Sequence, residues 1–147
     1  MTHSKPILRR RALQLVPHLI ERAKRVNASP LMRHSIGRVA LFGSVLSHRH
    51  KLGDLDVAVE LIEREGEFDT AAFLARYPVP VNAPVFDRLH WPAVVAKCEL
   101  RVHPAVHTTF FDFVIARDLP HKLIFDGRAG QMACARQPQT VTGCTKA

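Results

Sequence analysis

The sequence predicts an α+β domain, in which a small mixed or antiparallel sheet carries helices mainly on one face. Apolar residues recur at helical spacing over residues 5–27, whereas polar and apolar residues alternate over residues 54–61, as in a strand. A short apolar run at residues 38–42 ends in Gly43-Ser44 and predicts a buried strand that enters a tight turn. The 147 residues suffice for one such domain.

The first helical stretch, residues 5–27, has one apolar stripe that Pro17 interrupts. Pro17 either kinks a single helix or stands near the start of a second one. Asn27 to Pro30 then end the helix.

The alternating strand at residues 54–61 has one acidic face and one core face, because successive side chains point to opposite sides. Asp54, Asp56 and Glu60 share the acidic face with Ala58. The core face is predicted to carry Leu55, Val57, Val59 and Leu61.

The rest of the chain predicts shorter elements. We expect helices at 67–77 and 91–100, a loop at 78–84, and a last strand at 121–125. Residues 100–115 leave two places for a further strand, 100–107 or 108–115. The expected organisation is a basic helical segment (1–34), a main domain (35–127) and a disordered tail (128–147).

The net charge of +8 is concentrated at the N-terminus. Residues 1–51 contain eleven Lys and Arg and one acid, whereas the remainder has ten Lys and Arg against twelve acids. Such a segment attracts polyanions, namely a nucleoside triphosphate, nucleic acid or an acidic protein. The alternative is a solvated basic face that only aids solubility. The three cysteines show no metal-type spacing, and we therefore expect a reduced, cytoplasmic protein. No apolar run is long enough to span a membrane.

The residues that suggest chemistry are Gly43-Ser44 and the pair Asp54 and Asp56. If a helix follows the Gly43-Ser44 turn, backbone N–H groups at its start favour phosphate, and glycine allows a close approach. Two aspartates on one strand face repel each other, and Mg²⁺ relieves that repulsion while it binds substrate phosphates. Lys51, in the basic spacer between the two motifs, is placed to contact the leaving pyrophosphate.

The stretch Phe42-Gly43-Ser44-Val45-Leu46 followed by Gly53-Asp54-Leu55-Asp56-Val57 resembles the DNA polymerase β-like nucleotidyltransferases, above all their minimal prokaryotic members. The resemblance implies a nucleotidyltransferase fold in which Gly43 and Ser44 bind the triphosphate while Asp54 and Asp56 bind magnesium. Active members also use a third carboxylate on a later strand. Asp112, which apolar residues flank, is the candidate if the strand is 108–115, and the acid is missing if the strand is 100–107.

The expected function is therefore transfer of a nucleoside monophosphate from a triphosphate, with ATP as the first candidate, to a hydroxyl of a small molecule, protein or RNA. The expected cofactor is Mg²⁺ or Mn²⁺. The alternative is an inactive domain of the same fold that binds nucleotide, nucleic acid or a partner protein. The resemblance implies a helical partner, as in toxin–antitoxin pairs, and the basic segment offers a surface for RNA or an acidic protein. His103 and His107 are spaced i, i+4, but Pro104 argues against a zinc-binding helix there.

Overall fold

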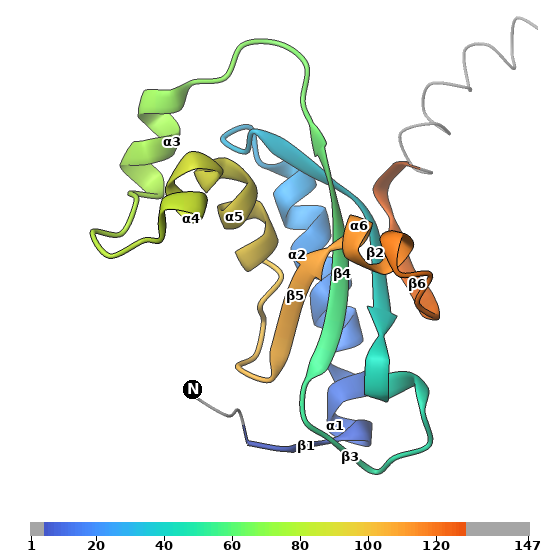
Figure 1. The fold of residues 1–147 in the computed structure, drawn as a ribbon. Helices are drawn as coiled ribbons and strands as arrows, with labels where there is room; N and C mark the ends of the chain where they lie inside the picture. Colours follow the sequence, from blue (N-terminus) through green and yellow to red (C-terminus); the bar gives the residue numbers. More distant parts are fainter. Residues whose placement is uncertain (1–4, 129–147) are drawn as a thin grey trace, which may run out of the picture.

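A four-stranded mixed sheet organises the chain in the computed structural model, which describes residues 5–128 (Figure 1). Its strands follow the order β5-β4-β2-β6. The central pair, β2 and β4, is antiparallel, β6 is antiparallel to β2, and β5 is parallel to β4. The α+β prediction is confirmed. The bounds are β2 His34–Phe42, β4 Leu55–Glu63, β5 Val106–Phe110 and β6 His121–Asp126.

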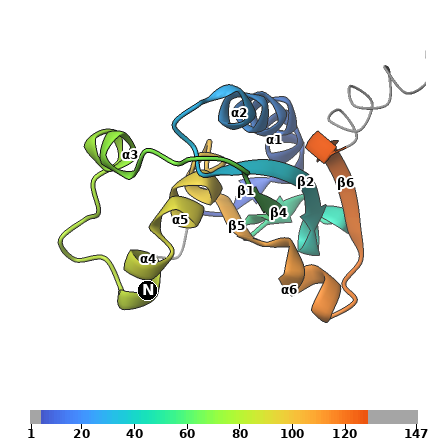
Figure 2. The same cartoon turned by 90° about the horizontal axis from the view of Figure 1, so that it is seen from above.

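Two helices separated at Leu15 cover one face of the sheet (Figure 2). They are α1 (Arg9–Gln14) and α2 (Val16–Ala28), with Pro17 in the first turn of α2. Of the two readings of this proline, the second is therefore confirmed. Proline is tolerated there because the first N–H groups of a helix have no partner within it.

The residues before α1 form a short strand rather than the expected start of a helix. This strand, β1 (Ile7–Leu8), pairs antiparallel with β3 (Lys51–Leu52), so the N-terminal segment is bound to the loop between β2 and β4. The backbone N–H of Arg9 extends this contact by donating to the carbonyl of His50 at 2.7 Å.

Three short helices connect β4 to β5 and project to one side (Figure 1). They are α3 (Thr70–Arg76), α4 (Val85–Leu89) and α5 (Trp91–Cys98). Asp69 caps α3 by accepting a hydrogen bond from the Ala72 N–H at 3.0 Å. The sequence predicted α3 and α5 but not α4, which is only five residues long.

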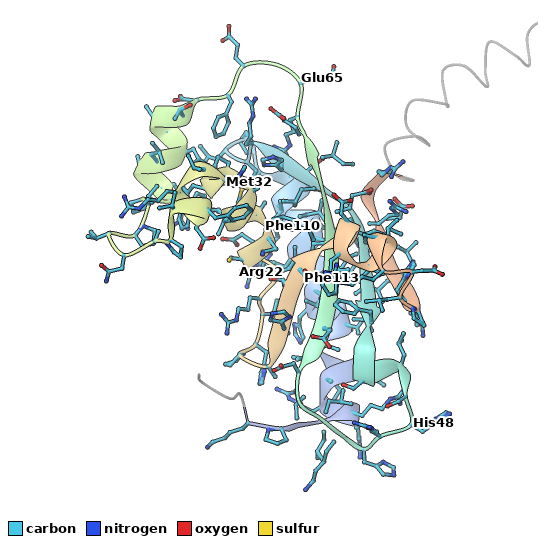
Figure 3. All side chains as sticks on the ribbon, in the orientation of Figure 1. Arg22, Met32, His48, Glu65, Phe110 and Phe113 are labelled. Carbon is cyan, nitrogen blue, oxygen red and sulfur yellow. The ribbon has the colours of Figure 1, made fainter. Side chains whose placement is uncertain are left out.

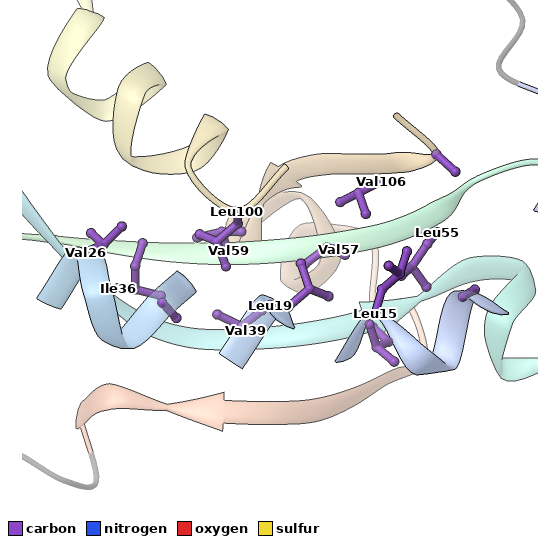
Figure 4. Close-up of a cluster of buried hydrophobic side chains, with 14 of the residues drawn as sticks. Leu15, Leu19, Val26, Ile36, Val39, Leu55, Val57, Val59, Leu100 and Val106 are labelled. Atoms are coloured by element: carbon purple, nitrogen blue, oxygen red, sulfur yellow. The ribbon is translucent and has the colours of Figure 1, made fainter. Parts of the chain in front are cut away.

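The main hydrophobic core lies between the sheet and the helices α1, α2 and α5 (Figure 4). Val57 and Val59 of β4 are fully buried there against Leu19 and Val26 of α2. A smaller cluster on the opposite face joins Ala40 and Ala58 to the last helix, α6 (Phe111–Ala116). Helices therefore cover mainly, but not only, one face.

The predicted tail lies almost wholly outside the described residues, which end at Arg128. Within residues 5–128, no helix is long and apolar enough to cross a membrane.

Candidate functional site

The two predicted acids stand at one end of β4, and Asp56 lies on the face that the main core does not cover. Asp54 immediately precedes β4, and Asp56 is its second residue. Leu55 and Val57, which alternate with Asp56, are fully buried on the other face. The predicted alternation is therefore confirmed, although the strand begins one residue after Asp54. The side chain of Asp56 remains 28% exposed, so its carboxylate is accessible from solvent.

Gly43 lies directly against the Asp56 carboxylate. The antiparallel pairing sets Phe42 opposite Asp56, so the chain turns at Gly43 beside that side chain. Gly43 has a φ of 76°, and a Cβ added there would lie 2.6 Å from Oδ2 of Asp56. Two constraints therefore require glycine at this position: its positive φ, and the space that a Cβ would take from the Asp56 carboxylate.

The turn after Gly43 is shorter than the sequence suggested. Residues Gly43–Leu46 form η1, a 3₁₀ turn of four residues, rather than the start of a longer helix. The carbonyl of Ser44 accepts hydrogen bonds from the N–H and hydroxyl of Ser47, at 3.0 and 2.6 Å. These bonds close the turn, but the expected contribution of a long helix dipole is absent.

His107 is the neighbour of Asp56 that the sequence analysis did not place in the site. The parallel pairing of β4 with β5 sets His107 beside Asp56, and its Nδ1 lies 3.5 Å from Oδ1 of Asp56. Its side chain is 67% exposed and is reachable from solvent. The strand that carries His107, β5 (Val106–Phe110), overlaps both ranges that the sequence left open for a strand, 100–107 and 108–115. The sequence therefore did not predict this pairing.

Three influences act on the pKa of Asp56. Burial raises the pKa most, because it disfavours the charged carboxylate, and the negative charge of Asp54 raises it further. The neighbouring His107 lowers it. The site therefore holds negative charge at a cost, and a cation bound there would lower that cost.

Asp112 does not occupy the position predicted for a third strand carboxylate. It lies exposed in the first turn of α6, where Phe111 and Val114 are buried against Ala40 and Ala58. Its charge acts on Arg38, whose pKa is raised first by a hydrogen bond to Glu60 and in smaller part by Asp112. The prediction that Asp112 lies on a strand is wrong, because the i, i+3 spacing of Phe111 and Val114 here belongs to a helix.

Lys51 is exposed on β3, where it pairs with Leu8, and within residues 5–128 its side chain makes no hydrogen bond or ion pair with the Gly43 turn. The basic side chain that does contact this turn is Arg9, whose Nε donates to the carbonyl of Val45 at 3.0 Å. No sequence pattern predicted this contact, because 36 residues separate the two partners.

The described residues fit a divalent cation only if substrate oxygens complete its coordination. Within residues 5–128, no group of three His, Cys, Asp or Glu side chains is arranged to hold a metal ion. Asp54 and Asp56 supply hard oxygen donors, and Mg²⁺ commonly uses one or two carboxylates together with phosphates and water. The fit is thus to a metal–nucleotide complex rather than to a resident metal.

Comparison with protein families, with curated proteins and with solved structures finds no match to this chain. The geometry described above therefore carries the functional argument.

Proposed function

We propose that the chain is a metal-dependent nucleotidyltransferase whose active site lies at the end of β4. The observation that carries this proposal is the direct contact between the Gly43 turn and the carboxylate of Asp56. A phosphate chain that lies on the turn is then beside the acids that bind its cation. Packing alone does not require a positive-φ glycine against a half-buried carboxylate.

The substrate in this proposal is a nucleoside triphosphate, with ATP as the first to test. Asp54 and Asp56 hold the divalent cation, and the N–H groups and hydroxyl of the Gly43-Ser44 turn donate to the phosphates. A bound Mg²⁺ or Mn²⁺ would offset the phosphate charge and orient the α-phosphorus. The acceptor hydroxyl oxygen bonds to that phosphorus, the bond to pyrophosphate breaks, and the hydroxyl proton is released.

His107 changes the expected metal preference. The resemblance implies a third carboxylate on a later strand, but the residue of β5 beside Asp56 is a histidine. Both Mg²⁺ and Mn²⁺ bind carboxylates, but Mn²⁺ accepts an imidazole nitrogen more readily than Mg²⁺, which favours oxygen donors. We therefore expect Mn²⁺ to support nucleotide binding at least as well as Mg²⁺.

A binding experiment on aspartate variants tests the proposal. We expect Asp56→Asn to weaken metal-dependent ATP binding about tenfold or more, since losing even an outer-shell partner of a metal ligand costs about 10- to 100-fold. The matched control is Asp112→Asn, the same chemical change on α6, which should bind like wild type. Isothermal titration with Mg²⁺ and with Mn²⁺ measures both. Equal binding by wild type and Asp56→Asn would remove the site from consideration.

The thermal melt without metal provides the second readout. Because burial raises the pKa of Asp56, its ionised form costs stability at neutral pH, and that cost grows as pH rises through the folded-state pKa. Asp56→Asn should therefore melt at or slightly above the wild-type temperature. A much lower melting temperature would make Asp56 a structural residue instead.

A second candidate function is nucleotide binding without transfer, and the histidine at the third position favours it. The two functions separate when labelled ATP is incubated with the protein, each metal and cell extract. Transfer of label to an acceptor supports the enzyme, whereas binding without transfer supports the second candidate. His107→Asp supplies the missing carboxylate and should increase Mg²⁺-dependent transfer if the enzyme reading is correct.

A further inference from the structure

Two cavities adjoin α1, and basic side chains line both. The larger, of about 840 Å³, lies between α1 and the loop before β3 that carries His48 (Figure 3), and its lining includes Arg9, Arg10, His48 and His50. The smaller, of about 360 Å³, lies between the two N-terminal helices and the segment before β5. Its basic lining residues are Arg11, His18, Arg22, Arg25 and His103.

The larger cavity combines this charge with an apolar surface. Leu8 and Leu13 line it and remain 56% and 37% exposed, so they are not used by the core. Arg10 is exposed, and its side chain makes no hydrogen bond or ion pair within residues 5–128. Cations around exposed leucines suit a ligand that carries both negative charge and flat apolar groups.

The two cavities adjoin across α1, because Arg10 lines one and its neighbour Arg11 lines the other. The smaller cavity also contains Glu21, which pairs with Arg25 at 3.9 Å, and Arg22 pairs with Glu99 at 3.3 Å. These pairs leave Arg11 as the arginine of this lining that has no acidic partner within residues 5–128. A polymer with repeated negative charge would reach Arg10 in one cavity and Arg11 in the other.

We propose that these two cavities bind single-stranded nucleic acid, which crosses α1 with phosphates on the arginines and a base against Leu8 and Leu13. A single strand presents a phosphate and an unpaired base in every nucleotide, so it matches charge and apolar surface together. A purely acidic peptide such as poly-glutamate matches the charge but not the exposed leucines. Arg9 links the larger cavity to the η1 turn, since it lines that cavity and its Nε donates to the carbonyl of Val45.

The test measures binding of a labelled 12-nucleotide RNA to the full chain by fluorescence anisotropy, without metal or triphosphate. DNA of the same sequence shows which sugar is preferred. We expect affinity to fall steeply between about 50 and 200 mM salt, as counterions are released. Arg10→Glu should weaken binding about fivefold or more, and it should reduce the salt dependence.

Two further variants distinguish binding at these cavities from nonspecific attraction to the positive charge of the protein. Lys24→Glu makes the same charge change at an exposed position of α2 that lines neither cavity, and we expect less than about twofold weakening. Leu13→Ala should weaken binding about fivefold at both salt concentrations without changing the salt dependence, because it removes a base contact.

Three results would overturn the inference: no binding at the lower salt, equal weakening by Arg10→Glu and Lys24→Glu, or equal competition by a poly-glutamate peptide of matched charge. The last result would assign the surface to an acidic protein. Because the assay contains neither metal nor triphosphate, it can succeed where ATP binding fails, and the two proposals can be rejected separately.

Discussion

At the scale of single residues, Gly43 links the backbone turn to the chemistry of Asp56. Its φ of 76° lies in the region that side-chain-bearing residues rarely adopt. The distance of 2.6 Å from a Cβ position to Oδ2 of Asp56 adds a steric constraint to the conformational one. Any larger residue must therefore move the turn or the carboxylate.

We predict that Gly43→Ala lowers the free energy of unfolding by about 1–3 kcal/mol, the usual cost of an unfavourable backbone conformation. It should also weaken metal-dependent ATP binding, because the carboxylate of Asp56 is displaced. Urea unfolding and titration measure the two effects. Gly53→Ala is the control, since a Cβ there meets nothing within 4 Å. Similar losses of stability and of ATP binding in both variants would show that the position of Gly43 has no particular role.

His107 and Asp112 show how far the sequence could predict the site. The alternating pattern predicted that Asp54 and Asp56 stand at one end of a strand, and the apolar run at residues 38–42 predicted that the preceding strand ends at Gly43. The partner of Asp56 on β5 depends on strand register, which the sequence does not reveal for residues 51 positions apart. Asp112 was assigned to a strand because a short apolar run fits both strand and helix, and only the contact of Phe111 and Val114 with β2 and β4 decides between them.

At the scale of elements, Glu60 joins three strands of the sheet. It accepts hydrogen bonds from Arg38 of β2, including one from the backbone N–H at 3.1 Å, and from Arg128 just after β6. A register shift in β2 between Ile36 and Val39 turns this backbone N–H toward the carboxylate. Hydrogen bonds from Arg38 lower the pKa of Glu60 to about 2, with Arg128 contributing.

We predict that Glu60→Gln destabilises the protein at neutral pH and that the difference disappears in acid. Since the folded-state pKa is depressed, the stabilisation is present above pH 4.5 and is lost as pH falls toward about 2. Urea unfolding of both proteins across this range measures it. Glu63→Gln, on the exposed pair with Arg33, should change stability by less than about 1 kcal/mol. A pH-independent difference for Glu60→Gln would show that packing, not charge, is responsible.

The sequence predicted the long elements better than the short ones. The stripe of α2 and the alternation of β4 extend over many residues, so each pattern repeats several times. The strands β1 and β3 have two residues each and exist because they pair with one another. Helix α4 follows a proline-rich loop and buries none of its residues, so no periodic pattern predicts it.

At the scale of the whole molecule, the basic N-terminal segment supplies both exposed positive charge and buried side chains of the main core. Arg10 and Arg11 reach the surface, whereas Ala12 between Arg11 and Leu13 is fully buried. The main core contains side chains from β1, α1 and α2 together with those of the sheet. The same short helix therefore presents charge outward and packs inward, and the two roles can be separated by experiment.

We predict that a chain starting at His34 does not fold. This truncation removes β1, α1 and α2. It also removes four core side chains that are at most 6% exposed, namely Ile7, Leu15, Leu19 and Val26. Burial of four such side chains contributes on the order of 6–12 kcal/mol, which is comparable with the whole stability of a domain. Thermal melts followed by circular dichroism should therefore show no cooperative transition. The control is the full chain with Arg10→Ala and Arg11→Ala, which loses charge but no buried side chain and should melt like wild type. A cooperative melt of the shortened chain near the wild-type temperature would mean that the sheet is stable without its N-terminal helices.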